Sequence, residues 1–239
     1  MKARVAIFAL SLTPVLALAQ MDVPTVTYPK LVQRASSIAG FVPKGWVLEQ
    51  TKTGDLNGDG RADAVLVLHQ NDPRNILENK DGFGVARLNS NPRIVAVVLT
   101  RAGGGYDLIA ENHRLIPRYD APNMDDPFDS VTLKKSAFRV TTHYWASAGS
   151  WTEWTTSFLF RYQNGCVRLN GYDRNDRQRN SGEEQGISVN FLTGQVKKTV
   201  YDPLKDKTSA NWSRLSKNPK RCFEAMGNGW EFEPETTQK

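Results

Sequence analysis

The chain has 239 residues, a formal net charge of +6 at pH 7 and 23% charged residues. This length is sufficient for one domain with a substantial apolar core. Basic residues concentrate in segments such as 172–180, 196–198 and 216–221, where Asp, Asn, Ser and Pro separate them. A nucleic-acid-binding stripe is denser and interleaved with aromatic residues, so the composition argues against nucleic acid as a partner.

Residues 1–19 have the pattern of a secretory signal peptide. A positively charged start is followed by an apolar run over residues 5–18 and by the small residues of a cleavage site at 17–19. An uncleaved membrane anchor is the alternative, but the run is short for a bilayer span and contains Pro14. We therefore expect an exported protein, periplasmic or secreted, with residues 20–239 as a single mainly-β domain and no membrane span after cleavage.

A short helix is predicted near the start of this domain. Pro29 suits a first helical position, and Gly40 suits the position where a helix ends. Between them, apolar residues recur at helical spacing, at Leu31, Val32, Ala35, Ile38 and Ala39.

Strand patterns dominate after this helix. Residues 46–50, 64–70, 93–101 and 106–112 are rich in apolar and β-branched side chains, and a triple-glycine turn at 103–105 precedes the last of them. No alternation of strands with helical patterns is found, so a parallel sheet is not indicated.

Three later segments are each predicted to contain two antiparallel strands. Their turns are expected near Lys135-Ser136, at Asn164-Gly165 and around Thr193-Gly194. Residues 203–239 have little strand pattern and are expected to wrap the sheet. The predicted fold class is therefore mainly β, with antiparallel meander sheets, one short N-terminal helix and a C-terminal segment tethered by a disulfide.

The segment 54–70 reads GDLNGDGRADAVLVLHQ and predicts a calcium site. Its loop covers residues 55–63. Side-chain oxygens stand at the first, third, fifth and ninth positions of this loop, and a backbone carbonyl stands at the seventh. Ca²⁺ takes six to eight oxygen ligands, with water supplying the rest. Without a cation, carboxylates gathered around one point repel one another. The predicted ligands are Asp55, Asn57, Asp59, the carbonyl of Arg61, and Asp63; a polar turn without metal is the alternative.

The context of this loop excludes an EF-hand, which has a bidentate Glu at the twelfth position and a helix on either side. Here the twelfth position is Leu66, within a segment that has the composition of a buried strand. Gly60 stands at the sixth position, where the chain must turn sharply. The loop resembles the calcium loops between β-strands in the FG-GAP or VCBS (integrin-type) families. Those families use the loop in tandem, so a single copy implies the strand–loop–strand device and not a propeller.

A wider resemblance covers most of the mature chain. The phrases that carry it are Phe41–Trp46, Gly54–Leu68, Phe160–Gly165, Leu169–Arg174 and Ser188–Gly194. In these phrases the chain is similar to a family of uncharacterised exported bacterial proteins of about this size. The resemblance implies a periplasmic or secreted bacterial protein and supplies no substrate.

Cys166 and Cys222 are the only cysteines of the chain. In an oxidising compartment they most simply form one disulfide, which would tie the C-terminal segment to the strand that starts at Cys166. Two buried, unpaired thiols are the alternative. Members of the family that the chain resembles often have an aromatic residue at the position of Cys166, which implies that the bridge is particular to this branch.

An aromatic cluster near the middle of the chain is a candidate binding surface. Trp145 and Trp151 flank the flexible-looking turn 146–150, and Trp154 follows shortly after. Exposed indole rings beside Gly and Ser stack on sugar rings or anchor protein partners. The alternative is that these residues simply begin a strand, with one aromatic ring in the core.

No catalytic constellation is evident. His69, His113 and His143 lie in separate segments, and no metalloprotease or serine-hydrolase motif is present. Several carboxylates would suit a glycosidase pair, although any acidic chain offers such pairs: Asp125, Asp126, Asp129, Glu153, Glu183 and Glu184.

The sequence therefore predicts an exported, calcium-stabilised, non-catalytic binding or envelope-associated protein whose partner is a glycan or another protein. A hydrolase of envelope glycan or peptide polymers is one alternative. A periplasmic inhibitor or immunity-type partner is the other.

Overall fold

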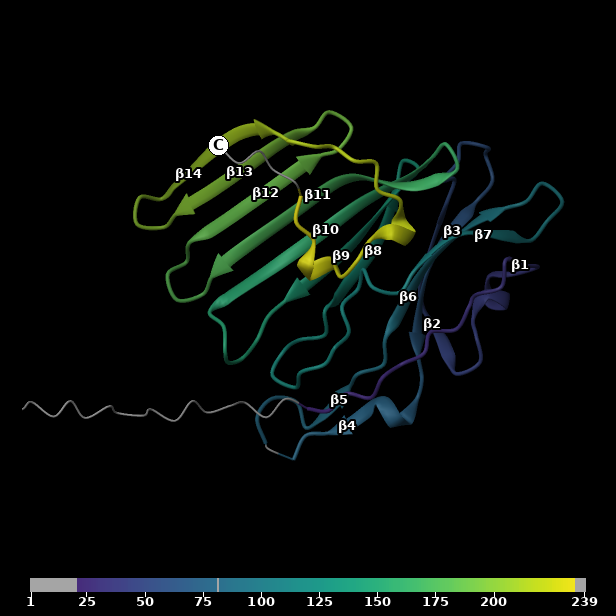
Figure 1. The fold of residues 1–239 in the computed structure, drawn as a ribbon, viewed down its shortest axis with the longest axis horizontal. Helices are drawn as coiled ribbons and strands as arrows, with labels where there is room; N and C mark the ends of the chain where they lie inside the picture. The colour runs from purple at the N-terminus through teal and green to yellow at the C-terminus, as the bar shows by residue number, and fades with distance from the viewer. Residues whose placement is uncertain (1–20, 81, 235–239) are drawn as a thin grey trace, which may run out of the picture.

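The computed structural model describes residues 21–80 and 82–234, so the predicted signal peptide lies outside the described residues. Two antiparallel sheets carry the fold, and the larger one fans out to one side of the smaller (Figure 1). The smaller sheet has the strand order β1-β7-β6-β3-β2, and the larger one runs in sequence order from β8 to β14. The mainly-β, antiparallel meander predicted from the sequence is confirmed.

The described elements are β1 (Arg34–Ala35), η1 (Ile38–Phe41), β2 (Trp46–Gly54), β3 (Asp63–Gln70), η2 (Pro73–Asn75), β4 (Ile76–Glu78), β5 (Arg87–Asn89), β6 (Arg93–Thr100), β7 (Tyr106–Asn112), β8 (Phe128–Lys134), β9 (Ala137–Tyr144), β10 (Thr152–Gln163), β11 (Cys166–Gln178), β12 (Glu184–Asn190), β13 (Gln195–Asp202), β14 (Lys207–Arg214), η3 (Phe223–Ala225) and η4 (Gly229–Glu231). Strands β4 and β5 form a separate two-stranded ribbon. No helix in the described part of the chain has the length and apolar character needed to cross a membrane.

The five-stranded sheet is buried on both faces at its centre. In β3, residues 64–68 are all fully buried, and β6 is buried from residue 93 to residue 99. One face of these strands contributes Val65, Val67, Val95 and Val97 to the core between the sheets. The opposite face is covered by the N-terminal segment. Continuous apolar runs, which replace the alternation of a one-sided strand, follow from this double burial.

The N-terminal segment is extended, so the predicted helix is wrong. Only a 3₁₀ turn, η1, forms near its end. The backbone carbonyl of Gln33 accepts a hydrogen bond from the amide of Leu108 (2.9 Å), and Arg34 pairs with Asp107 of β7. Leu31 and Phe41 of this N-terminal segment pack onto the five-stranded sheet. Pairing with a sheet edge has outweighed the helical spacing of the apolar residues.

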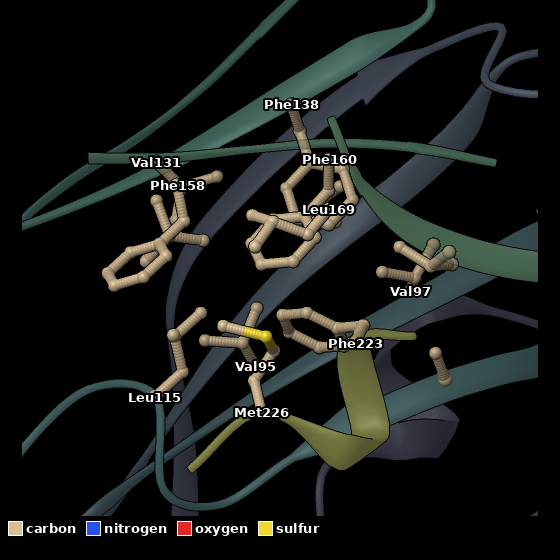
Figure 2. Packing of buried hydrophobic residues seen from close by; sticks show 14 of the residues in the cluster. Val95, Val97, Leu115, Val131, Phe138, Phe158, Phe160, Leu169, Phe223 and Met226 are labelled. Atoms are coloured by element: carbon tan, nitrogen blue, oxygen red, sulfur yellow. The ribbon is translucent and has the colours of Figure 1, made fainter. Parts of the chain in front are cut away.

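The main core lies between the two sheets. Figure 2 shows the rings of Phe138, Phe158 and Phe160, from the seven-stranded sheet, facing Val95 and Val97 of the five-stranded sheet. All three Phe side chains are at most 1% exposed. Phe223 and Met226 of the C-terminal segment fill the remaining space, with the Phe223 ring packed edge-on against Phe138 and Phe160.

One buried cation joins the two sheets. Arg93 begins β6, and its side chain is 6% exposed. Its guanidinium donates to both carboxylate oxygens of Glu49 in β2 (2.6 and 2.8 Å) and to both of Asp126, just before β8 (2.7 and 2.8 Å). Burial by itself lowers the pKa of Arg93, but its two carboxylate partners raise that pKa above the ordinary value of arginine. The arginine therefore stays charged and holds β2 and β6 of the smaller sheet beside the start of β8 in the larger one.

The hairpins of the seven-stranded sheet follow their turn residues. Lys135 and Ser136 both have positive φ, as do Asn164 and Gly165, which is the geometry of a tight two-residue turn. The third predicted turn, at Thr193-Gly194, joins β12 to β13. Strand β14 was not predicted. Its segment KTSANWSR is exposed at seven of its eight residues, and an edge strand of this kind lacks the apolar alternation that identifies a strand.

The C-terminal segment is fastened to the sheets in two ways. Cys166 at the start of β11 is joined to Cys222, as predicted. Asn112, 4% exposed at the end of β7, donates from its amide group to the carbonyls of Phe223 (2.7 Å) and Met226 (2.9 Å). Its carbonyl oxygen accepts from the amides of Arg114 and Leu115, so this buried side chain is fully hydrogen-bonded.

Replacing both cysteines by alanine should lower the free energy of unfolding. The bridge closes a loop of 56 residues, for which the chain-entropy estimate is about 4 kcal/mol. Urea unfolding of the Cys166→Ala/Cys222→Ala variant and of the wild type, without reductant, measures the difference. Reduced and alkylated wild type should match the variant. Two alkylatable thiols in the native, unreduced protein would contradict the bridge.

Candidate functional site

The base of the β2–β3 loop is built around one buried carboxylate. Asp63 begins β3 and is fully buried. Its Oδ2 accepts from the amide of Leu56 (2.8 Å), and its Oδ1 accepts from the amide of Thr100 at the end of β6 (2.8 Å). Asp63 thus fixes the start of the loop to the neighbouring strand. Thr100 adds a second tie, because its hydroxyl donates to the carbonyl of Ala62.

The tip of the loop folds around Asp55. The Asp55 carboxylate accepts from the amides of Gly58 (2.6 Å), Asp59 (3.2 Å) and Gly60 (2.9 Å). The hydrogen bond from Gly60, followed by those from Gly58 and Asp59, lowers the pKa of Asp55 below its ordinary value although desolvation opposes the shift. Gly58 and Gly60 have φ of 84° and 81°, a backbone region that favours glycine.

Asn57 and Asp59 complete this tip. Asn57 accepts from the amide of Asp59 (3.0 Å), and Asp59 accepts from the amide of Arg61 (2.9 Å). The Arg61 guanidinium also pairs with the Asp59 carboxylate and donates to the Thr100 carbonyl (3.1 Å). All five predicted calcium ligands are oxygen atoms, and all five belong to this one loop, which is fixed to β6. Residues 21–80 and 82–234 contain no group of three or more His, Cys, Asp or Glu side chains arranged to hold a metal ion.

The turn before β10 is held by one arginine. The Arg179 guanidinium lies 4.9 Å from the Trp145 ring and 5.9 Å from the Trp151 ring. One of its nitrogens donates to the carbonyls of Ala146 and Ser150, both at 2.6 Å. Trp151 remains 65% exposed. The turn thus presents Trp151 to solvent from a fixed position.

The side chain of Trp154 is on the core side of the sheet, on the same face of β10 as Phe158 and Phe160. Its ring stacks on Tyr144 at 3.9 Å and meets Trp230 of the C-terminal segment edge-on at 6.0 Å. The Arg174 guanidinium lies over the same ring at 4.7 Å. Of the three predicted tryptophans, Trp145 and Trp154 both contribute to the lining of the larger hollow described below, and Trp151 does not. Trp230 belongs to this cluster, but it stands 76 positions away from Trp154 in a segment without a strand pattern, so the sequence offered no sign of it.

The face of the seven-stranded sheet that points away from the core, here called the outer face, is polar. The register aligns small polar side chains in rows across the strands because directly paired residues share a face. One row consists of His143, Thr155, Asn175, Gly186 and Thr199. The next consists of Thr141, Ser157, Asp173, Ser188, Lys197 and Trp212.

A groove crosses this outer face. A hollow of about 450 Å³ includes Asp129 of β8, Trp145, and the strand residues between them. A second hollow of about 410 Å³ reaches Thr208 of β14. Asn175 and Glu184 line both hollows, so the two are adjacent; together, and called the groove here, they extend from the first to the last strand of the sheet. Seven strands at the usual spacing make it roughly 29 Å long.

The groove has more acidic than basic groups. Asp129, Glu153 and Glu184 line its larger hollow, with Arg177 and His143 as the basic groups. Asp176 also contributes to the lining, but its carboxylate pairs with Arg174 on the other face of the sheet. Arg177 lies between two of the carboxylates, 3.7 Å from Glu153 and 3.8 Å from Glu184. Asn175, Thr155 and Thr199 supply hydrogen-bonding groups along the floor. The groove is therefore suited to a long, hydroxyl-rich or amino-bearing ligand.

The other residues considered from the sequence are dispersed. His69 contacts Glu49 (3.6 Å) near the buried Arg93, and His113 stacks on Tyr28. His143 alone lines the groove, 3.9 Å from Asp125. Of the six candidate carboxylates, Asp126 is the partner of Arg93, whereas Asp129, Glu153 and Glu184 meet in the groove.

Trp151→Ala should change the free energy of unfolding by less than about 1 kcal/mol, as exposed substitutions do. Trp154→Ala should cost about 3–5 kcal/mol, because it removes a ring stacked under the C-terminal segment. Urea unfolding of the two variants side by side measures both. A large loss for Trp151→Ala would show that this ring supports the fold and is not a free surface.

Comparison with known protein families, with curated proteins and with solved structures finds no match to this chain. The groove and the anchored loop are thus the features from which a function is argued.

Proposed function

We propose that the chain is an exported, calcium-stabilised, non-catalytic binding protein that holds a glycan polymer on the outer face of its seven-stranded sheet. The observation that carries this proposal is the groove, which is lined from β8 to β14. A length of roughly 29 Å suits several consecutive sugar units better than a single small ligand. The predicted export route and the disulfide agree with a role outside the cytoplasm.

The chemistry of the groove favours sugars over apolar or anionic ligands. Hydroxyl and amide side chains such as Thr155, Asn175 and Thr199 both donate and accept, as sugar hydroxyls require. Trp145 at one end and Tyr201 along the groove offer aromatic surface for sugar rings. The excess of carboxylates would repel a polyanion, so we expect neutral or amino-bearing glycans to bind.

A hydrolase is the second candidate, because three of the carboxylates named from the sequence meet in this groove. Glycoside hydrolysis needs two carboxyl groups on opposite sides of the scissile bond, one of them protonated. Glu153 and Glu184 instead share Arg177, which lies within 3.8 Å of both. This arrangement supports binding without catalysis.

Filling the groove should abolish glycan binding. Asn175 lines both hollows and is exposed, so Asn175→Lys should block the groove while leaving the melting temperature within a few degrees of the wild type, as surface substitutions do. Retention on insoluble peptidoglycan, chitin and cellulose, and on immobilised alginate as the polyanionic comparison, measures binding. At least one of the first three should retain the wild type, and alginate should not.

Asn211→Lys is the matched control, since it places the same side chain on the opposite face of β14. It should bind like the wild type. Failure of all the neutral and amino-bearing polymers to retain the wild type, or equal retention of the Asn175→Lys variant, would refute the glycan proposal. Release of reducing ends that is lost in Glu153→Gln would instead establish the hydrolase.

We also propose that the β2–β3 loop binds Ca²⁺ through Asp55, Asn57, Asp59, the Arg61 carbonyl and Asp63. Support comes from the all-oxygen donor set, which is what Ca²⁺ prefers. The left-handed glycines at 58 and 60 and the lowered pKa of Asp55 suit a compact, ionised loop. When bound, the ion would supply positive charge that offsets repulsion among the carboxylates.

Calcium should therefore raise the melting temperature of protein that has been stripped with chelator. The unfolded chain cannot hold these ligands together, and linkage gives about 2.7 kcal/mol at one hundred times the dissociation constant. Thermal melting from micromolar to several millimolar Ca²⁺ measures the shift. Mg²⁺ should give a smaller one, because its strict octahedral shell suits an all-protein loop poorly.

Two variants separate metal binding from a purely structural turn. Asp59→Ala removes a central carboxylate and should abolish the calcium response. Arg61→Ala keeps the backbone carbonyl and removes the guanidinium that pairs with Asp59, so it should keep the response. Absence of any calcium-dependent shift in the wild type would show that the loop is a turn only.

A further inference from the structure

A further hollow of about 440 Å³, separate from the two that make up the groove, lies on the outer face at the opposite end of the strands. Leu159 lines it and Thr155 lines the groove, so the two are separated by four residues of β10, roughly 13 Å. Its walls carry the cationic side chains of Lys134, Lys135, Arg139 and Arg161. No acidic residue of the described chain lines it. This hollow is called the basic cradle below.

A β-bulge shapes the basic cradle. Leu159 of β10 pairs with Gly171, whereas the next residue, Phe160, pairs with Leu169, so Asn170 is the extra residue of β11. Gly171 leaves the row without a side chain, and a Cβ at this position would lie 3.3 Å from the Cβ of Leu159. The floor is thus depressed where the flanking strands carry full side chains. Bulges commonly occur next to binding sites.

Most of the positive charge in the basic cradle is uncompensated. Arg139 is paired with Asp173 (2.8 Å). Arg161 donates to the carbonyl of Lys135 (2.9 Å), which is a neutral partner. Within residues 21–80 and 82–234, no carboxylate forms an ion pair with Lys134, Lys135 or Arg161. Three exposed cations around one hollow would attract an anion of more than one negative charge.

The rest of the lining of the basic cradle is uncharged. Asn170 lines it and is 7% exposed. Leu159, Ala137 and the 60% exposed Leu192 give the hollow an apolar lining.

We propose that the basic cradle binds a phosphate monoester that carries an apolar group. At neutral pH a phosphate monoester has a charge of about −1.5 to −2, which matches three uncompensated cations better than a single carboxylate does. Arg161 can donate to two phosphate oxygens, and the lysines act as point charges. The apolar substituent would lie on Leu159 and Leu192. This site does not depend on glycan binding in the groove.

Titration calorimetry with hexyl phosphate, inorganic phosphate and hexanol tests the proposal. Hexyl phosphate should bind saturably with one site, inorganic phosphate should bind more weakly, and hexanol should not bind. Lys134→Gln and Arg161→Gln should each weaken hexyl phosphate binding by about tenfold, the usual effect of losing a charge-assisted hydrogen bond. Leu192→Ser should weaken the binding of hexyl phosphate and leave that of inorganic phosphate unchanged.

Lys198→Gln, which removes an exposed lysine from the opposite face of the same sheet, is the control and should bind like the wild type. Melting curves show which variants are folded. If the Arg161→Gln variant is unfolded, the Lys134→Gln variant alone decides the test. Flotation with phosphatidate vesicles identifies a lipid source if they bind and a soluble source if they do not. Equal binding of inorganic and hexyl phosphate, equal binding by the Lys134→Gln variant, or no binding of either phosphate would overturn the site.

Discussion

The arrangement of the two sheets depends on the buried guanidinium of Arg93. A cation that is 6% exposed is tolerated only with full compensation, and Glu49 and Asp126 provide it from different parts of the chain. Removing either carboxylate would leave the guanidinium with one ion-pair partner and without two of its four hydrogen bonds, a loss that is costly at a buried site. Because Glu49 is in β2 and Asp126 precedes β8, the ion-paired cluster fixes the smaller sheet relative to the start of the larger one. The outer face is exposed as a result, since the smaller sheet is held against the other side.

Because one face of the larger sheet is covered and the other is exposed, its two faces carry different side chains. Its core side carries Phe138, Phe158 and Phe160, and the alternate residues carry Thr141, Thr155 and Ser157. Period-two alternation thus places the apolar core side chains on one face of these strands and the polar side chains of the outer face on the other. The groove and the basic cradle differ in charge although they share strands, because β10 presents Glu153 at one end and Arg161 at the other. One rigid sheet therefore offers two chemically distinct sites at a fixed distance.

The sequence predicted those parts of the fold that are decided locally. Strands β3 and β6 were identifiable because double burial gives long apolar runs, and the turns at Lys135-Ser136 and Asn164-Gly165 because few residues accept positive φ. The disulfide followed from there being two cysteines. The N-terminal helix failed because pairing of Arg34 with β7 is a contact across more than seventy residues. The groove was invisible for a similar reason: it depends on register, which aligns Glu153, Arg177 and Glu184 from three strands.

The position of Phe223 has a consequence for the order in which this protein folds. The strands of the larger sheet all pair with neighbours in sequence, and such local contacts favour rapid formation. The aromatic core, however, includes Phe223, which follows Phe160 by 63 positions in the chain. A chain synthesised from its N-terminus forms the hairpins of β8 to β11 first, and Phe138 and Phe160 then stay open on one side until Phe223 has been added. The partly formed sheet exposes apolar surface during this interval, which is when a chaperone is most needed.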